Sequence, residues 1–461
     1  MASTRSSYIL ANHFAPLSKA LYPKENKLSE YFEIAYAATS NRLCLFTGTG
    51  FSKSVSDNKA PSWQGLLESI CDLLDSGDDL KTGLFPEDGK NPLSLEEAAQ
   101  VISIELQKVD KSIHEEVSRL ISSIDLAGDN QSIIEFLSKR SCRVVTTNYD
   151  KLIEEIVGHD DCHSLTPGLP IPRSSSRVKV YHVHGSVDSP ENMVITSDDY
   201  FKFINGESYF SRKLSTVLHE NTVVILGYSL GDTNLKSIIS DYKGFSKNHV
   251  IGSNIFLVSR SKIDQPVKDY YAHCYGIRVI DETPNHKFFS RLNKKIPIAE
   301  KCTESSVDNI KDAVYKNKEF TKNFLSMENT FYEIVSSIAA IGVSIDDPRV
   351  VKSIGRIIEI KTELTQVNNA WEQYEHMARW LIYLSSILDL KGTSIEDVFL
   401  VATLSSMSSM RHEKYVGYSW HAYNSWSFRW SGIIASNRAM IRDHIAANTT
   451  WSDALNVVNR G

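Results

Sequence analysis

The sequence predicts an α/β protein, a Rossmann-like parallel sheet with helices on both faces, followed by an all-helical C-terminal domain. Short apolar, β-rich runs alternate with longer helical segments from about residue 28 to 280, and the strand signal ends after about residue 300. Runs that are apolar throughout are typical of strands buried on both faces, and helical segments between them favour parallel pairing. We therefore expect a sheet domain over residues 1–295 and a helical domain, for oligomerisation or regulation, over residues 296–461.

The expected strands share two features, an apolar run of four to six residues and a small or polar residue soon after it. Runs of this length suit strands, because helices need longer segments. We predict strands at 43–47 (LCLFT), 143–147 (RVVTT), 178–183 (VKVYHV), 222–227 (TVVILG), 254–258 (NIFLV) and 277–280 (IRVI).

The last third of the chain has helical signals. Asp347 followed by Pro348 is typical of a helix start, since aspartate caps the first turn and proline fits its first position. Thr393 and Glu396 have the spacing of a capping box for a later helix. The polar stretch 302–320 is the expected junction between the two domains.

Composition narrows the class of protein. The 461 residues are 42% hydrophobic and 23% charged, as in globular proteins, and the net charge of −6 argues against broad nucleic-acid binding. The first residues lack a secretory signal and no long apolar stretch follows, so we expect a cytoplasmic protein without membrane contact. Six cysteines occur without a CxxC pair or a histidine cluster, so we expect reduced thiols and no metal site.

Small and polar residues follow four of the predicted strands. Because the carboxyl ends of parallel strands meet at one edge of a sheet, where open α/β sheets bind their ligands, these residues should line one cleft. Glycines there allow a ligand to approach the backbone closely, although a tight turn alone would also use them. The segments are GTGFS at 48–52, TNYD at 147–150, HGS at 184–186 and GYSLGD at 227–232.

In this order the four segments resemble motifs of the sirtuin family. GTGFS resembles the family's glycine-rich turn, and TNYD resembles its QNID segment. HGS resembles the segment of its catalytic histidine, and GYSL resembles its phosphate loop. The resemblance covers roughly residues 30–290. Deacylating sirtuins carry a zinc ribbon of two CxxC pairs, whereas this chain has no cysteine between His184 and Gly227 and has APSW, with Trp63, in place of the family's Pro-Asp-Phe-Arg segment. The pattern is similar to prokaryotic sirtuin-like effectors of anti-phage defence, which hydrolyse NAD.

The resemblance implies an NAD+ hydrolase that cleaves the nicotinamide–ribose bond, without zinc, and depletes NAD in abortive infection. It implies that Asn148 holds the ribose or positions the water and that His184 is the base, a task suited to imidazole near neutral pH. Asp150 would hold the carboxamide, and Ser259, with Arg260 beside it, would contact the adenosine ribose. The residues expected to bind NAD are Gly48, Thr49, Gly50, Ser52, Thr147, Asp150, Gly227, Ser229, Asp232 and Ser259.

Alternatives stay open for several of these residues. His184 would be a structural histidine, Asn148 a turn former, and Asp150 and Asp232 helix caps. Arg260 would be a solvated charge rather than a ligand. His182, on the same strand face as His184, is expected to be structural. The tryptophans at 371, 380, 420, 426 and 430 are expected in a helical core rather than in a cofactor cage.

Alternatives remain for the whole protein as well. The chain would otherwise be an NAD-dependent protein deacylase, or a non-catalytic sensor of NAD or ADP-ribose. An enzyme that consumes NAD requires control, so we expect a homo-oligomer, in which the aromatic stretch 411–430 supplies core packing or a self-association surface. Relatives of this kind suggest a separate partner such as a HerA-type ATPase.

Overall fold

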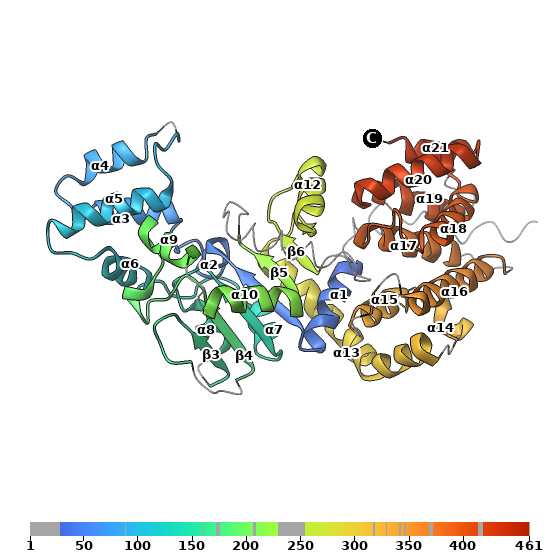
Figure 1. The fold of residues 1–461 in the computed structure, drawn as a ribbon, viewed down its shortest axis with the longest axis horizontal. Helices are drawn as coiled ribbons and strands as arrows, with labels where there is room; N and C mark the ends of the chain where they lie inside the picture. The colour runs from blue at the N-terminus through green and yellow to red at the C-terminus, as the bar shows by residue number, and fades with distance from the viewer. Residues whose placement is uncertain are drawn as a thin grey trace, which may run out of the picture.

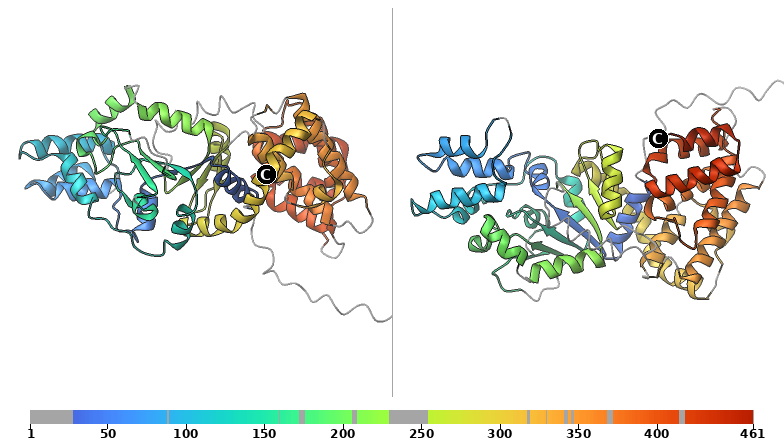
Figure 2. Two further views of the ribbon diagram at one scale, coloured as in Figure 1. Left: turned by 90° about the horizontal axis from the view of Figure 1, so that it is seen from below. Right: turned by 45° about the horizontal axis from the view of Figure 1, so that its top comes forward.

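The computed structural model shows a sheet domain with helical regions on either side of it (Figure 1). Figure 2 shows the same three parts from two further directions, with the helices of residues 63–121 at one end and the C-terminal helices at the other. The structure describes residues 28–87, 89–158, 160–171, 176–205, 209–228, 254–316, 319–328, 330–340, 343–344, 347–367, 372–413 and 418–460.

Seven parallel strands form one sheet in the order β3-β4-β2-β1-β5-β6-β7. The predicted fold class is confirmed, and each of the six predicted strands is present. The additional strand, β3, has the polar sequence CHSL and lies at the edge of the sheet. An edge strand pairs with a neighbour on one side only, so it can contain polar residues and lack an apolar run. The strands are β1 Leu43–Thr47, β2 Cys142–Thr146, β3 Cys162–Leu165, β4 Val178–His182, β5 Thr222–Leu226, β6 Ile255–Val258 and β7 Ile277–Ile280.

Both faces of the sheet are covered, which explains the continuous apolar runs. In β1, Leu43 and Leu45 point into one core, and Cys44 and Phe46 point into the other. The first core includes side chains of α1 (Leu28–Thr39), α7 (Gln131–Leu137), α8 (Leu152–Val157) and α13 (Asn285–Lys316), and the second those of α10 (Tyr209–Glu220) and α12 (Gln265–Tyr275).

A separate group of helices follows the first strand and its short helix α2 (Thr49–Val55). These helices share a core of their own, to which Met193 and Ile195 contribute from the segment before α9. They extend away from the sheet in Figure 1. The group consists of α3 Trp63–Cys71, α4 Gly77–Leu84, α5 Leu95–Gln107 and α6 Ile113–Ile121, beside α9 Ser197–Asn205.

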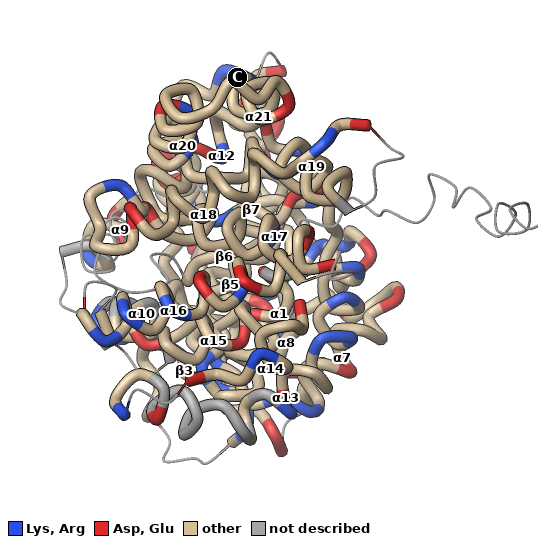
Figure 3. Tube along the Cα trace, turned by 90° about the vertical axis from the view of Figure 1, so that its right-hand side faces the viewer, with Lys and Arg blue, Asp and Glu red and all other residues tan. Residues whose placement is uncertain are grey.

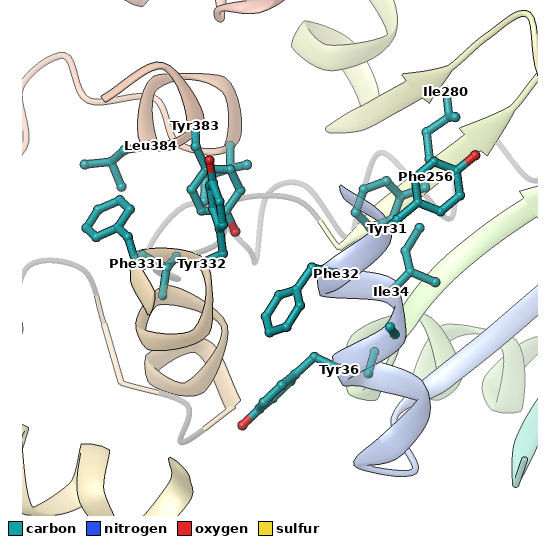
Figure 4. Close-up of a cluster of buried hydrophobic side chains, with 14 of the residues drawn as sticks. Tyr31, Phe32, Ile34, Tyr36, Phe256, Ile280, Phe331, Tyr332, Tyr383 and Leu384 are labelled. Carbon is teal, nitrogen blue, oxygen red and sulfur yellow. The ribbon is translucent and has the colours of Figure 1, made fainter. Parts of the chain in front are cut away.

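The C-terminal region is helical and packs directly on the sheet domain. Side chains of α1, of the sheet and of the C-terminal helices form one continuous core, part of which Figure 4 shows around Phe32 and Tyr332. Tyr36 Oη and Ser337 Oγ are hydrogen-bonded across this core at 3.0 Å. The helices are α14 Lys322–Ser326, α15 Thr330–Ala340, α16 Pro348–Thr365, α17 Glu372–Ile387, α18 Glu396–Ser408, α19 Tyr418–Arg429, α20 Ala435–Asn448 and α21 Ser452–Val458.

Local details of this region differ from expectation in two places. The expected junction, residues 302–320, belongs to helix α13 as far as Lys316. The same helix begins at Asn285 and runs through residue 295. The division of the chain at residue 295 therefore stays a prediction. The expected capping box is wrong, since Ile395 occupies the N-cap of α18 and Glu396 accepts a hydrogen bond from the Gly392 amide. The predicted start of α16 is confirmed, with Asp347 accepting from Arg349 N.

The surface mixes both signs of charge, with basic and acidic positions interspersed along the helices that face the viewer in Figure 3. Within the described ranges, no helix has the length and apolarity needed to cross a membrane. Trp380, Trp426 and Trp430 are buried in the helical core, as predicted. Trp420 is only half-buried, and Trp371 lies outside the described residues.

Candidate functional site

Two glycine turns meet at the carboxyl ends of β1 and β5. Gly50 N donates to the Gly227 carbonyl at 2.7 Å, and Gly48 N donates to the Leu226 carbonyl at 3.1 Å. Gly227 has a φ of +61°, in the left-handed region, and a Cβ there would overlap the Phe51 amide. The glycines are therefore needed for close contact between two turns, and they leave this rim of the sheet edge without side chains.

Asn148 follows β2 and lies directly beside the β1 turn. Its Nδ2 donates to Ser52 Oγ at 2.7 Å, and Ser52 Oγ donates to Asp150 Oδ2 at 2.6 Å. Burial raises the pKa of Asp150 above its ordinary value, although the hydrogen bonds from Ser52 and the Leu152 amide oppose the shift. Asp150 also accepts from Leu152 N, the first residue of α8, although the N-cap position itself is occupied by Lys151. Asp150 lines the cleft at the same time.

His184 follows β4, and 7% of its surface is exposed. Its ring meets the rings of Tyr200 and Phe203 edge-on, with centroids 5.4 and 5.3 Å away. The His184 carbonyl accepts from Val194 N at 2.8 Å, and Gly185 takes a φ of +87° immediately after it. The backbone is thus fixed on both sides of the imidazole.

A single cleft of about 1020 Å³ collects most of the predicted site residues. It lies at the edge where β4, β2, β1 and β5 end side by side, which is the usual ligand position in an open α/β sheet. Its volume suits a ligand of dinucleotide size. The predicted residues that line it are Thr49, Gly50, Ser52, Thr147, Asn148, Asp150, His184 and Gly227.

The other predicted residues lie elsewhere. Gly48 is not part of the cleft lining, and a Cβ added to it would overlap the Tyr228 side chain. Ser259 follows β6 outside the lining, and its hydroxyl donates to the Ser261 carbonyl at 2.8 Å. Ser229 and Asp232 fall outside the described residues.

Five aromatic side chains line the cleft, and we refer to them together as the aromatic wall: Trp63, Tyr149, Tyr200, Phe201 and Tyr228. Trp63 and Tyr149 pack with their ring centroids 6.0 Å apart, and Tyr149 Oη donates to the Val194 carbonyl at 2.6 Å. Tyr149 and Tyr228 lie inside sequence segments that were already singled out. The two α9 residues gave no sequence signal, because only folding places that helix over His184.

Basic and acidic groups also reach the cleft. Lys53 lines it from α2, and Glu96 and Glu97 line it from the first turn of α5. Glu97 is occupied in a capping box with Ser94. Among the residues that the structure describes, no group of three or more His, Cys, Asp or Glu is arranged to hold a metal ion.

A buried pair of side chains, His182 and Glu154, lies behind Asn148. His182 is fully buried, and its Nδ1 and Nε2 lie 3.1 Å from the Asn148 carbonyl and 2.8 Å from Glu154 Oε1. Burial alone would raise the pKa of Glu154, but interactions with His182 and Lys151 outweigh it and lower the pKa to about 2. His182 is structural in the sense predicted, yet it contacts a predicted catalytic residue, a link that sequence alone did not reveal.

Comparison with known proteins finds a family similar to this sheet. Residues 143–280 match the family described as the SIR2-like domain. This part of the chain is thus similar to a SIR2-like domain. The match runs from β2 to the end of β7 and contains Asn148, His184 and Gly227, while the glycine turn after β1 precedes it and is hydrogen-bonded to it.

Three curated relatives share sequence with the chain. Defense-associated sirtuin 2 of Bacillus subtilis is 23% identical over 254 residues, which cover 54% of this chain and 24% of the relative. NAD(+) hydrolase ThsA of Bacillus cereus (strain MSX-D12) is 29% identical over 227 residues, covering 47% and 44%. NAD(+) hydrolase ThsA of Enterococcus faecium is 36% identical over 104 residues, covering 21% and 22%. The chain thus spans less than half the length of each relative.

Proposed function

We propose that this chain is an NAD+ hydrolase that cleaves the bond between nicotinamide and ribose, giving nicotinamide and ADP-ribose, and that it depletes NAD as an effector of anti-phage defence. The observation that carries the proposal is the convergence of Asn148 and His184 on one cleft of about 1020 Å³ that the glycine turns leave open. The names of the relatives, NAD(+) hydrolase and defense-associated sirtuin, support it.

Cleavage of the nicotinamide–ribose bond requires little acid catalysis at the leaving group. Nicotinamide departs as a neutral molecule with the electron pair of the glycosidic bond, because the pyridinium of NAD+ is already cationic. Water then adds to C1′ of the oxocarbenium-like ribose, and its proton passes to a base. We assign the ribose or the water to Asn148 and the proton to His184, whose imidazole titrates near neutral pH in ordinary proteins.

The phosphates and the nicotinamide are assigned to different groups of lining residues. Gly50, Ser52 and Gly227 lie where backbone and hydroxyl donors meet a pyrophosphate, with Lys53 as a nearby cation. We assign the nicotinamide ring to the aromatic wall, because stacking of a planar heterocycle on aromatic side chains is favourable. Asp150 is the proposed carboxamide contact, and Ser259 the proposed adenosine-ribose contact.

Incubation of the purified full chain with NAD+, followed by chromatography of the products, tests the proposal. We expect nicotinamide and ADP-ribose in equal amounts without any peptide. Acetyl-ADP-ribose formed only with an acetyl-lysine peptide would identify a deacylase instead. Intact NAD+ that still binds the protein, with cellular NAD also unchanged on expression, would identify a sensor. Either result would overturn the proposal.

Control of the enzyme is proposed to involve assembly in the cytoplasm. Phe428 in α19 is 79% exposed, whereas Trp426 beside it is fully buried, so the aromatic stretch 411–430 combines core packing with an apolar surface position. We propose a homo-oligomer, with a separate ATPase of the HerA type as a possible partner. Light scattering at micromolar concentration tests the assembly, and a monomer throughout would exclude it.

A further inference from the structure

The peptide of Asn148 is held by side chains rather than by a strand ladder. Residue 148 follows the end of β2, its N–H donates to Thr146 Oγ1 at 3.1 Å, and its carbonyl lies 3.1 Å from His182 Nδ1. The Thr146 hydroxyl in turn donates to the Thr47 carbonyl at 3.2 Å. The direction in which the Asn148 carboxamide points therefore depends on these neighbours.

His182 is itself fixed from the opposite side. It is the last residue of β4, paired in register with Thr146, and its ring is completely buried. Its Nε2 lies 2.8 Å from Glu154 Oε1, in α8, and the Glu154 side chain is 4% exposed. A carboxylate that accepts from one imidazole nitrogen sets the orientation of the ring and of the other nitrogen.

The carboxylate is anchored by a second cation. Lys151 Nζ lies 2.9 Å from Glu154 Oε1 and also contacts Ser164 Oγ at 2.6 Å and Asp188 Oδ2 at 2.7 Å. The charged groups around the imidazole are thus Glu154, Lys151 and, through the field of the neighbouring turn, Asp150. Glu154 stays ionised over the whole range in which enzymes are assayed, since its pKa is about 2.

Both nitrogens of His182 face oxygen acceptors. A carbonyl oxygen can only accept, so Nδ1 must carry a proton to bind Asn148, and Nε2 must carry one to bind the carboxylate. Both contacts are complete only in the doubly protonated ring. Loss of either proton would place a nitrogen lone pair against an oxygen lone pair and would release the Asn148 peptide.

We propose that His182 and Glu154 are positioning residues for Asn148 in NAD+ hydrolysis. Neither residue lines the cleft, so both act through the Asn148 backbone. The proposal rests on the proposed function for its kinetic consequence, but its structural consequence, the orientation of the Asn148 carboxamide on Ser52, is independent of any activity.

Two substitutions at His182 separate positioning from bulk packing. His182→Asn keeps a donor at the place of Nδ1, within reach of the Asn148 carbonyl, whereas His182→Gln moves the donor toward Glu154. We expect His182→Gln and Glu154→Gln to lower kcat by about 10- to 100-fold, the range typical of residues that orient a functional group, with KM changed less than about twofold. His182→Asn should retain more of kcat than His182→Gln.

The division of the effect between kcat and KM supplies a readout that a loss of packing alone would not give. A misplaced Asn148 carboxamide should slow the chemical step in Glu154→Gln while the groups proposed to hold NAD+ stay in place, so kcat should fall and KM should change little. His163 lies on the neighbouring strand β3, outside the cleft lining, and His163→Gln is the matched control, which should leave kcat and KM unchanged.

A crystal structure of Glu154→Gln tests the proposal even without activity. We expect the Asn148 carboxamide to leave Ser52 Oγ, which lies 2.7 Å away in the parent protein. An unchanged carboxamide, or variants that match the parent in kcat, would overturn the positioning role. A parent protein that releases no nicotinamide would instead contradict the proposed function, and the structure of the variant would still decide the role of the pair.

Discussion

Gly50 and Gly227 are in direct backbone contact, with Gly50 N donating to the Gly227 carbonyl at 2.7 Å. This contact joins the turn after β1 to the turn after β5, on the two sides of the proposed phosphate position. It leaves no space for a side chain at either residue, because a Cβ on Gly50 would lie 2.8 Å from the Gly227 carbonyl oxygen. The cleft therefore depends on two residues that have no functional group.

Gly227→Ala should destabilise the protein by roughly 2–4 kcal/mol, from the left-handed backbone and the overlap with Phe51. It should also weaken NAD binding. Urea unfolding and titration calorimetry measure the two effects. Gly83→Ala, in α4 with no atom near the added methyl group, is the control and should raise stability by up to about 1 kcal/mol. Equal midpoints for Gly227→Ala and the parent would contradict the contact.

Asn148→Ala and His184→Ala should each lower turnover by roughly 10²- to 10⁴-fold, the range for loss of a general base or of a comparable positioned group. The circular dichroism spectrum should be unchanged. Nicotinamide release over time is the measurement. Parent-like turnover in both variants would refute the assignment of the site.

Ionisation of Glu154 should make the free energy of unfolding depend on pH in the acidic range. Its pKa is about 2 in the folded protein against an ordinary 4.5, so its contribution is present above pH 4.5 and is lost as the pH falls toward 2. One pKa unit corresponds to about 1.4 kcal/mol, which gives a contribution of about 3 kcal/mol. Urea unfolding from pH 6 to pH 3 should show a shallower loss in Glu154→Gln than in the parent. The exposed Glu135→Gln should follow the parent, and parallel curves for all three would exclude the effect.

Arg278 and Glu33 form a buried ion pair between β7 and α1, with both guanidinium ends donating to the carboxylate at 2.9 and 2.5 Å. Arg278→Met would leave the Glu33 carboxylate buried without its partner, which costs about 3–5 kcal/mol. The double change Glu33→Leu with Arg278→Met should recover most of that loss. A double-mutant cycle by urea unfolding measures this, and additive losses would contradict it.

Lys361 in α16 is buried beside Trp380, and burial lowers its pKa to about 7 despite the opposing charge of Glu328. The unfolded chain then binds more protons than the folded one between pH 7 and 10.5, so stability should rise with pH over that window. Lys361→Met should remove the rise. Thermal unfolding at pH 7 and pH 9 measures it, and an equal pH dependence in parent and variant would contradict the prediction.

Much of the sheet could be predicted because its strands are apolar on both faces. The same argument explains the failure at β3, whose edge position permits the polar sequence CHSL. The convergence of Asn148 with His184 followed from parallel pairing alone. Parallel strands place their carboxyl ends at one edge whatever the connecting helices do.

Contacts that depend on helix placement could not be predicted. Tyr200 reaches His184 only because α9 packs on α5, and nothing in the local sequence specifies that docking. Glu154 pairs with His182 because α8 returns under β4, and a glutamate in an amphipathic helix gives no sign of a buried partner. The pairing of His182 with Glu154 could therefore be recognised only in the folded structure.

The unbroken helix α13 limits how this protein can be divided. Phe288 and Leu292 precede residue 295, whereas Ile296 and Ala299 follow it, and all four belong to the same core. A chain truncated at residue 295 would end in mid-helix and would expose the apolar side of α1. Exchange of the C-terminal region between homologues would therefore have to carry α1 and α13 along with it, so the two regions are expected to evolve as one inherited unit.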